Sequence, residues 1–276
     1  MMWKLAFAVL ALSVNLFANL VISVPSGAGV WSAGVAPDEN NWDAFWDNRS
    51  RDGNRCNIGY WLRDTNWSDA NGPGNRCNND LFVASTGGPG TDLAFLRNTS
   101  GPNTPVGWRF QASGPQQATT LRLEVAGWRN SNTFGYGTYD SSGNRITTEL
   151  FNGPTSPNAS AAVNVAAGQE FFFYFCPNGD CTNILYSDTA YSSSDPRSGK
   201  FALFSEDPLS PTATSNIHRY WIGVEDTAGS DGIEGWGDFN DFVITAYVVP
   251  EPGFYGLLAI GLSGLYLLRR RRNSAD

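Results

Sequence analysis

The chain has 276 residues, of which 41% are hydrophobic and 16% are charged, and this excludes both a disordered chain and a coiled coil. Its 18 basic and 26 acidic residues give a net charge of −8, which argues against nucleic acid as a partner. The single histidine, His218, excludes a metal centre built from several imidazoles, and we expect one domain with appendages.

Residues 1–28 predict a secretory signal peptide. Lys4 provides a positive charge, and the apolar run from Leu5 to Leu12 follows it. Small residues at Ser26 and Ala28 favour cleavage after Ala28, and Leu16-Phe17-Ala18 is a second, poorer site. An uncleaved membrane anchor is the alternative.

Residues 35–80 are polar and rich in aromatic side chains. Aromatic rings can stack on sugars while Asn and Asp donate and accept hydrogen bonds beside them. Four tryptophans in this region are therefore candidate glycan-binding residues: Trp42, Trp46, Trp61 and Trp67. The alternative is that these rings fill the core and seal loops.

The even number of cysteines predicts disulfides in an exported chain. Three pairings are possible, and proximity in sequence favours Cys56–Cys77 and Cys176–Cys181. The second pair would close a tight turn containing Asn178-Gly179. A zinc ion held by four thiolates is the alternative.

Short apolar stretches with turn residues between them run through the rest of the body. Residues 120–125 alternate polar and apolar side chains, as in a half-buried antiparallel strand, and Phe171–Phe175 suits a strand between two layers. The pattern predicts an all-β, jelly-roll-like antiparallel sandwich spanning residues 29–249. The expected strands are Asp92–Leu96, Gly107–Gln111, Thr119–Gly127, Thr133–Asp140, Arg145–Phe151, Ala161–Val165, Glu170–Phe175, Ile184–Ser187, Lys200–Ser205, Arg219–Glu225 and Asp241–Val249.

Hard oxygen ligands are concentrated near the end of the body, and Glu225 and Glu234 add to them. Calcium takes six to eight oxygens in a flexible shell, which suits a loop between two strands. The predicted ligands are Asp226, Asp231, Asp238, Asn240 and Asp241. One alternative is that the Asp and Asn side chains accept hydrogen bonds from backbone N–H groups in a Gly-rich turn. Another is a catalytic carboxylate pair.

The extreme C-terminus combines three features. Pro250-Glu251-Pro252 precedes an apolar run from Phe254 to Leu268, and four arginines follow, Arg269, Arg270, Arg271 and Arg272. The run predicts a short transmembrane helix whose arginines snorkel and keep the tail in the cytoplasm. An ordinary single-pass anchor would need the same helix and charges.

These three features together resemble the PEP-CTERM sorting signal of exported bacterial proteins. The resemblance implies that a membrane-embedded exosortase cuts near Pro-Glu-Pro and releases or re-anchors the protein. It also implies a bacterium that makes extracellular polysaccharide, which is a possible partner. The sorting signal would span residues 250–276.

Residues 200–249 resemble a second, largely uncharacterised motif of exported bacterial proteins. Its parts are an aromatic-rich strand ending in Glu225-Asp226 and a strand opening with Asp238-Phe239-Asn240-Asp241. The resemblance implies a β domain and no activity.

The leading hypothesis is an exported protein of the cell envelope or extracellular matrix, without enzymatic activity. It would be anchored in the membrane at first and then located at the cell surface or outside the cell. A carbohydrate-binding module is the first alternative and a secreted glycan-active enzyme the second, because a glycosidase needs only two nearby carboxylates.

Overall fold

The structure is a computed structural model of the chain, and it describes residues 20–25, 29–33, 94–98, 106–112, 116–124, 131–153, 159–190, 192, 195, 197–205, 219–226, 239, 241–247 and 261–266. The chain divides into two compact units. One unit is Asn19–Val248, and the other combines Met1–Ala18 with Val249–Asp276.

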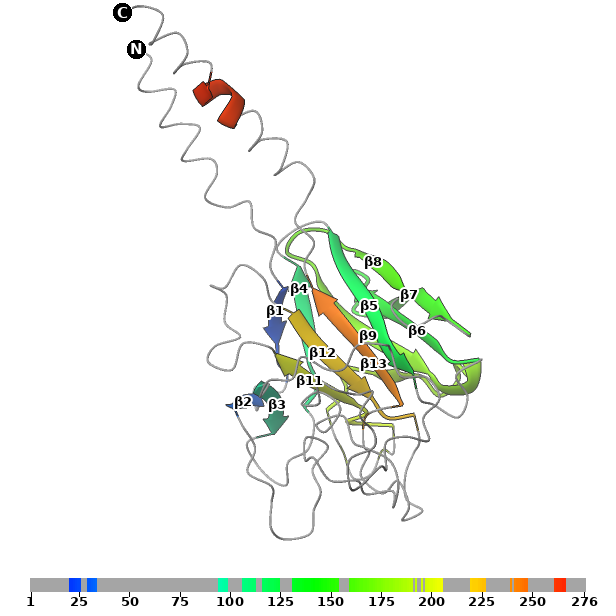
Figure 1. Cartoon of the computed structure of the whole chain (residues 1–276). Coiled ribbons are helices and arrows are strands. Elements are labelled where there is room, and N and C mark those ends of the chain that lie inside the picture. Colours follow the sequence, from blue (N-terminus) through cyan, green and yellow to red (C-terminus); the bar gives the residue numbers. More distant parts are fainter. Residues whose placement is uncertain are drawn as a thin grey trace, which may run out of the picture. The chain divides into compact units, whose positions relative to one another are not determined.

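The larger unit contains two antiparallel sheets (Figure 1). The strands of the first sheet are β1 (Leu20–Ser23), β4 (Arg109–Ala112), β6 (Thr133–Tyr139), β7 (Arg145–Asn152), β9 (Glu170–Cys176) and β10 (Leu185–Tyr186). Their order is β1-β4-β9-β6-β7, and β10 also pairs with β9.

The second sheet is formed by β2 (Gly29–Ala33), β3 (Ala94–Asn98), β5 (Gln116–Glu124), β8 (Ser160–Asn164), β11 (Phe201–Ser205), β12 (Arg219–Val224) and β13 (Phe242–Tyr247). Their order is β2-β3-β11-β12-β13-β5-β8. The prediction of an all-β fold with antiparallel sheets is therefore confirmed, while the jelly-roll connectivity stays a prediction.

Each expected strand from residue 92 onward coincides with an observed strand, with ends that differ by a few residues. The structure adds β1 and β2, which the sequence did not predict. β1 lies within the segment expected to be signal peptide. Because this segment is largely apolar, it does not show the alternation of polar and apolar side chains that indicates a strand. Leu20 in β1 is buried, and β1 pairs with β4 over four residues.

Aromatic side chains from both sheets form the core between them. Phe134 of β6 stacks on Phe242 of β13 with 4.9 Å between ring centroids. Phe110 of β4 contacts Tyr220 of β12 at 5.1 Å. Such ring pairs contribute about 0.5–1.5 kcal/mol each beyond the area they bury, so they hold the two sheets face to face.

Strand β9 is apolar on both faces, as the sequence predicted, but its outer face is covered by side chains. Phe172 and Tyr174 project to that face, and both are buried. A Cβ at Gly137 would overlap the Phe172 ring, and one at Gly135 would overlap Tyr174. These glycines therefore let the two rings lie flat on the neighbouring strand β6.

In the smaller unit, residues 261–266 are helical with exposed side chains. Among the residues that the structure describes, no helix has the length and apolar character needed to span a membrane. The rest of the helix predicted for Phe254–Leu268 lies outside the described residues.

Candidate functional site

Three carboxylates meet where β12 ends and β13 begins. Glu225 and Asp226 follow β12, and Asp241 precedes β13, whose Phe242 pairs with Val224. One oxygen from each carboxylate lies within 4.8 Å of the others. The backbone N–H of Asp226 also donates to Oδ2 of Asp241 at 2.8 Å. The antiparallel pairing of the two strands thus brings residues 15 apart in sequence into contact.

Burial gives this acidic cluster its chemical character. Glu225 is 2% exposed and Asp226 is 9% exposed. Carboxylates brought together away from water repel one another when ionised, and a bound cation relieves that repulsion. Oxygen donors of this type suit calcium better than a soft transition metal.

The structure thus brings together two of the five predicted calcium ligands, Asp226 and Asp241, with Glu225, which the sequence had already placed in the same acidic cluster. Asp231, Asp238 and Asn240 lie outside the described residues. Calcium binding stays a prediction.

A second charged cluster, which the sequence did not predict, lies on the outer face of the first sheet. Its centre is Asp188, whose side chain is only 1% exposed. Asp188 accepts hydrogen bonds from Nη2 of Arg145 at 2.8 Å and from the hydroxyl of Tyr139. Nε of Arg109 lies 3.8 Å from Oδ2 of the same carboxylate.

Aromatic rings hold both guanidinium groups of this cluster. Cζ of Arg109 lies 4.5 Å from the ring centroid of Tyr139, and Cζ of Arg145 lies 4.2 Å from that of Tyr186. Nη1 of Arg109 also donates a hydrogen bond to Oε2 of Glu170 at 3.1 Å. Stacking and ion pairing together fix the position of each arginine.

Burial raises the pKa of Tyr139 to about 12, and its hydrogen bond to Asp188 adds to this effect. The phenol therefore stays protonated at neutral pH. Through these contacts Asp188 joins side chains from β4, β6 and β7 and forms a clamp between these strands.

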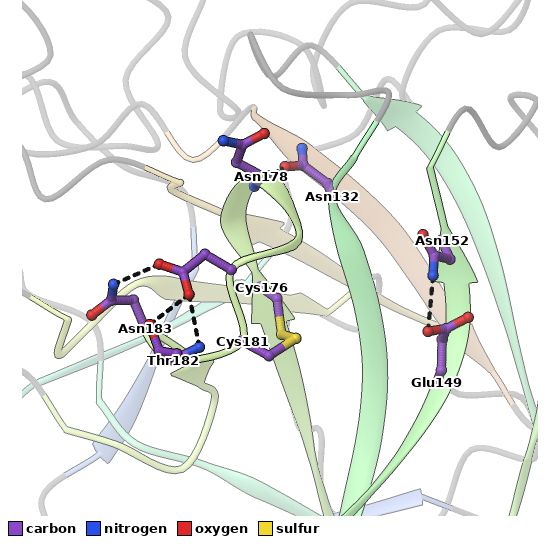
Figure 2. Close-up of a disulfide and its surroundings, with 9 residues drawn as sticks. Asn132, Glu149, Asn152, Cys176, Asn178, Cys181, Thr182 and Asn183 are labelled. Atoms are coloured by element: carbon purple, nitrogen blue, oxygen red, sulfur yellow. Dashed lines mark hydrogen bonds between the residues drawn. A yellow bond between two sulfur atoms is a disulfide. The ribbon is translucent and has the colours of Figure 1, made fainter.

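The Cys176–Cys181 disulfide is present, as predicted (Figure 2). It closes a turn in which Asn178 and Gly179 both have positive φ. Within the turn, Asp180 accepts a hydrogen bond from Nδ2 of Asn183 at 2.9 Å.

The bond removes two of the thiolates that a four-cysteine zinc site would need, so that alternative was wrong. Cys56 and Cys77 lie outside the described residues.

The tryptophans predicted to bind glycans, Trp42, Trp46, Trp61 and Trp67, lie outside the described residues. Trp108 and Trp221, by contrast, are buried in the core. The residues of the sorting signal also lie outside the described part, namely Pro250, Glu251, Pro252, Arg269, Arg270, Arg271 and Arg272.

Comparison with protein families matches residues 248–272 to the PEP-CTERM protein-sorting motif. The resemblance found at the C-terminus is therefore confirmed. The motif indicates an exported protein that is held in the membrane and then processed by an exosortase. No curated protein and no solved structure matches the chain, so the resemblance to the Asp-x-Asn-Asp domain has no support.

Proposed function

We propose that the protein is an exported structural component of the cell envelope or extracellular matrix, delivered there by an exosortase. The sorting motif at residues 248–272 is the observation that carries this proposal. The Cys176–Cys181 disulfide supports it, because disulfides persist mainly outside the reducing cytosol. The aromatic core and the clamp around Asp188 suit a rigid scaffold.

Before processing, the apolar run from Phe254 to Leu268 holds the chain in the membrane as a helix. The arginines that follow it stay in the cytoplasm, in accordance with the positive-inside rule. The β-rich unit then lies on the opposite side of the membrane. A cut near Pro250-Glu251-Pro252 separates it from this anchor.

At the other end, we place the signal-peptide cut after Ala18. β1 begins at Leu20, which is 1% exposed and whose carbonyl accepts a hydrogen bond from the hydroxyl of Tyr220 at 3.3 Å. A cut after Ala28 would remove this strand and uncover the edge of β4. A cut after Ala18 keeps β1 in the first sheet.

The test is the intact mass of the protein recovered from wild-type cells and from cells that lack the exosortase. We expect an N-terminus at Asn19 in both, and a C-terminus near Pro250 only where the exosortase is present. A mature N-terminus at Gly29 would refute the retention of β1. A full-length cytosolic chain with reduced thiols would refute the whole proposal.

Glycan assays separate this proposal from the two alternatives. A structural component neither retains nor cleaves polysaccharide on a broad array. Retention that is lost in Trp42→Ala, Trp46→Ala, Trp61→Ala or Trp67→Ala variants would replace the proposal with carbohydrate binding. Product release that a single carboxylate substitution abolishes would replace it with enzymatic activity.

A further inference from the structure

The second sheet is apolar on the face that points away from the first sheet, which we call its outer face. Phe242 of β13 and Tyr220 of β12 contact the first sheet, so the residues that alternate with them project to the outer face. Residues that lie directly opposite each other in the strand register share a face. Six residues of the outer face are 3% exposed or less, namely Phe95, Ala202, Phe204, Trp221, Val243 and Thr245.

Three large rings lie side by side on this outer face. Phe204 of β11 is opposite Phe95 of β3 on one side and Trp221 of β12 on the other (Figure 1). Each such ring has about 150–250 Å² of surface to bury, and monomers rarely leave an apolar patch of more than a few hundred Å² exposed. The three rings are only 2% or 3% exposed, so another part of the same chain covers them.

The described strands do not supply this cover. Every described strand belongs to one of the two sheets, and the first sheet lies on the inner face of the second. Within the larger unit, the candidates for the cover are therefore the connections between strands.

The connection between β2 and β3 leaves the second sheet and returns to it beside the three rings. The two strands pair up to Ala33 opposite Ala94, and a turn of two residues would be enough to join them there. The chain instead inserts residues 34–93, and Phe95 follows almost directly. The insertion thus starts and ends at the margin of the outer face, and it belongs to the same compact unit as the two sheets.

Aromatic content distinguishes this insertion from the other connections at the outer face. Residues 206–218, between β11 and β12, contain no Phe, Trp or Tyr, and residues 227–238, between β12 and β13, contain only Trp236. Aromatic rings pack favourably on other aromatic rings. Residues 34–93 contain seven of them: Trp42, Phe45, Trp46, Tyr60, Trp61, Trp67 and Phe82.

We propose that residues 34–93 fold back over the outer face of the second sheet and bury Phe95, Phe204 and Trp221 beneath their own aromatic side chains. The body then has three layers, with the second sheet in the middle. The tryptophans considered for glycan binding belong to this third layer: Trp42, Trp46, Trp61 and Trp67. The layer stabilises the fold whether or not the protein is a component of the matrix.

Limited digestion of the full chain with trypsin, in mild detergent, tests the packing of this layer. Trypsin cuts after arginine, and residues 34–93 contain five: Arg49, Arg51, Arg55, Arg63 and Arg76. Phe204→Ala leaves a cavity beneath the layer, so we expect cleavage within residues 34–93 to be at least tenfold faster than in the wild type. Phe172→Ala is the matched control, because this ring is similarly buried but lies on the outer face of the first sheet. We expect it to leave this cleavage unchanged.

Two results would overturn the proposal. One is cleavage within residues 34–93 that is as fast in the wild type as in Phe204→Ala, with the same circular dichroism in both. The other is an equal acceleration of this cleavage by Phe204→Ala and by Phe172→Ala.

A pair of deletions identifies the connection that provides the cover. An Asn-Gly turn replaces residues 34–93 in one variant and residues 206–218 in the other. Labelling by hydroxyl radicals, measured by mass spectrometry, reports the exposure of Trp221, with Trp108 between the sheets as the internal reference. We expect the labelling of Trp221 relative to Trp108 to rise at least tenfold in the first variant only. An unchanged ratio in the first variant, or an equal rise in the second, would refute the assignment of the cover to residues 34–93.

Discussion

Replacing Asp188 with Ala tests whether the clamp on the first sheet stabilises the fold. The side chain of Asp188 is 1% exposed, and it bonds Arg145 and Tyr139 while Arg109 lies within ion-pair distance. Its removal leaves two guanidinium groups without their shared carboxylate. These groups also stay confined by the rings stacked on them.

The loss of stability expected for Asp188→Ala follows from the burial of Asp188 and of the side chains that it pairs with. Removing one member of a buried ion pair costs about 3–5 kcal/mol. The side chains of Arg109 and Arg145 are 27% and 37% exposed, so water recovers part of the loss. We therefore expect about 3 kcal/mol, at the lower end of that range. A domain of this size then melts about 6–12 °C lower.

The assay compares thermal and urea unfolding of Asp188→Ala with that of Asp195→Ala. Asp195 pairs with Arg197 at 3.2 Å on the surface, where the two side chains are 37% and 51% exposed. An exposed pair of this kind contributes about 1 kcal/mol or less. Equal losses in the two variants would refute the idea that burial makes the clamp important.

Three further outcomes are expected. The folded pKa of Tyr139 is about 12, against an ordinary value of 10.0, so its contribution to stability is complete below pH 10 and is lost as the pH rises toward 12. Urea midpoints of wild type and Tyr139→Phe across that interval measure this, and parallel curves would contradict it. The Cys176→Ser/Cys181→Ser variant opens a loop whose ends are 5 residues apart in sequence. We expect its free energy of unfolding to fall by about 2 kcal/mol in chemical unfolding. An unchanged unfolding midpoint would refute this expectation. For the predicted calcium site, we expect EDTA to lower the Tm and added calcium to restore it. Asp241→Asn should abolish this response. A Tm that EDTA leaves unchanged would refute the prediction of calcium binding.

The strands and the sorting signal were predictable because each is encoded by neighbouring residues. Alternation with period two in residues 120–125 and the apolar run of β9 mark both segments as strands, whatever these strands pair with. The Cys176–Cys181 turn is equally local. β1 was missed because an apolar segment near an N-terminus has the same composition as a signal peptide, so only its pairing with β4 distinguishes it.

The charged clusters required the tertiary structure. Asp226 and Asp241 could be proposed as neighbours because they occur in one acidic segment, but the burial of Glu225 beside them follows from the pairing of β12 with β13. Arg109 and Asp188 occur in unrelated segments, and nothing in their sequence surroundings marks either residue. The strand order β4-β9-β6-β7 brings these side chains to one face, since contacts between distant residues depend on register and sheet order, which local patterns do not encode.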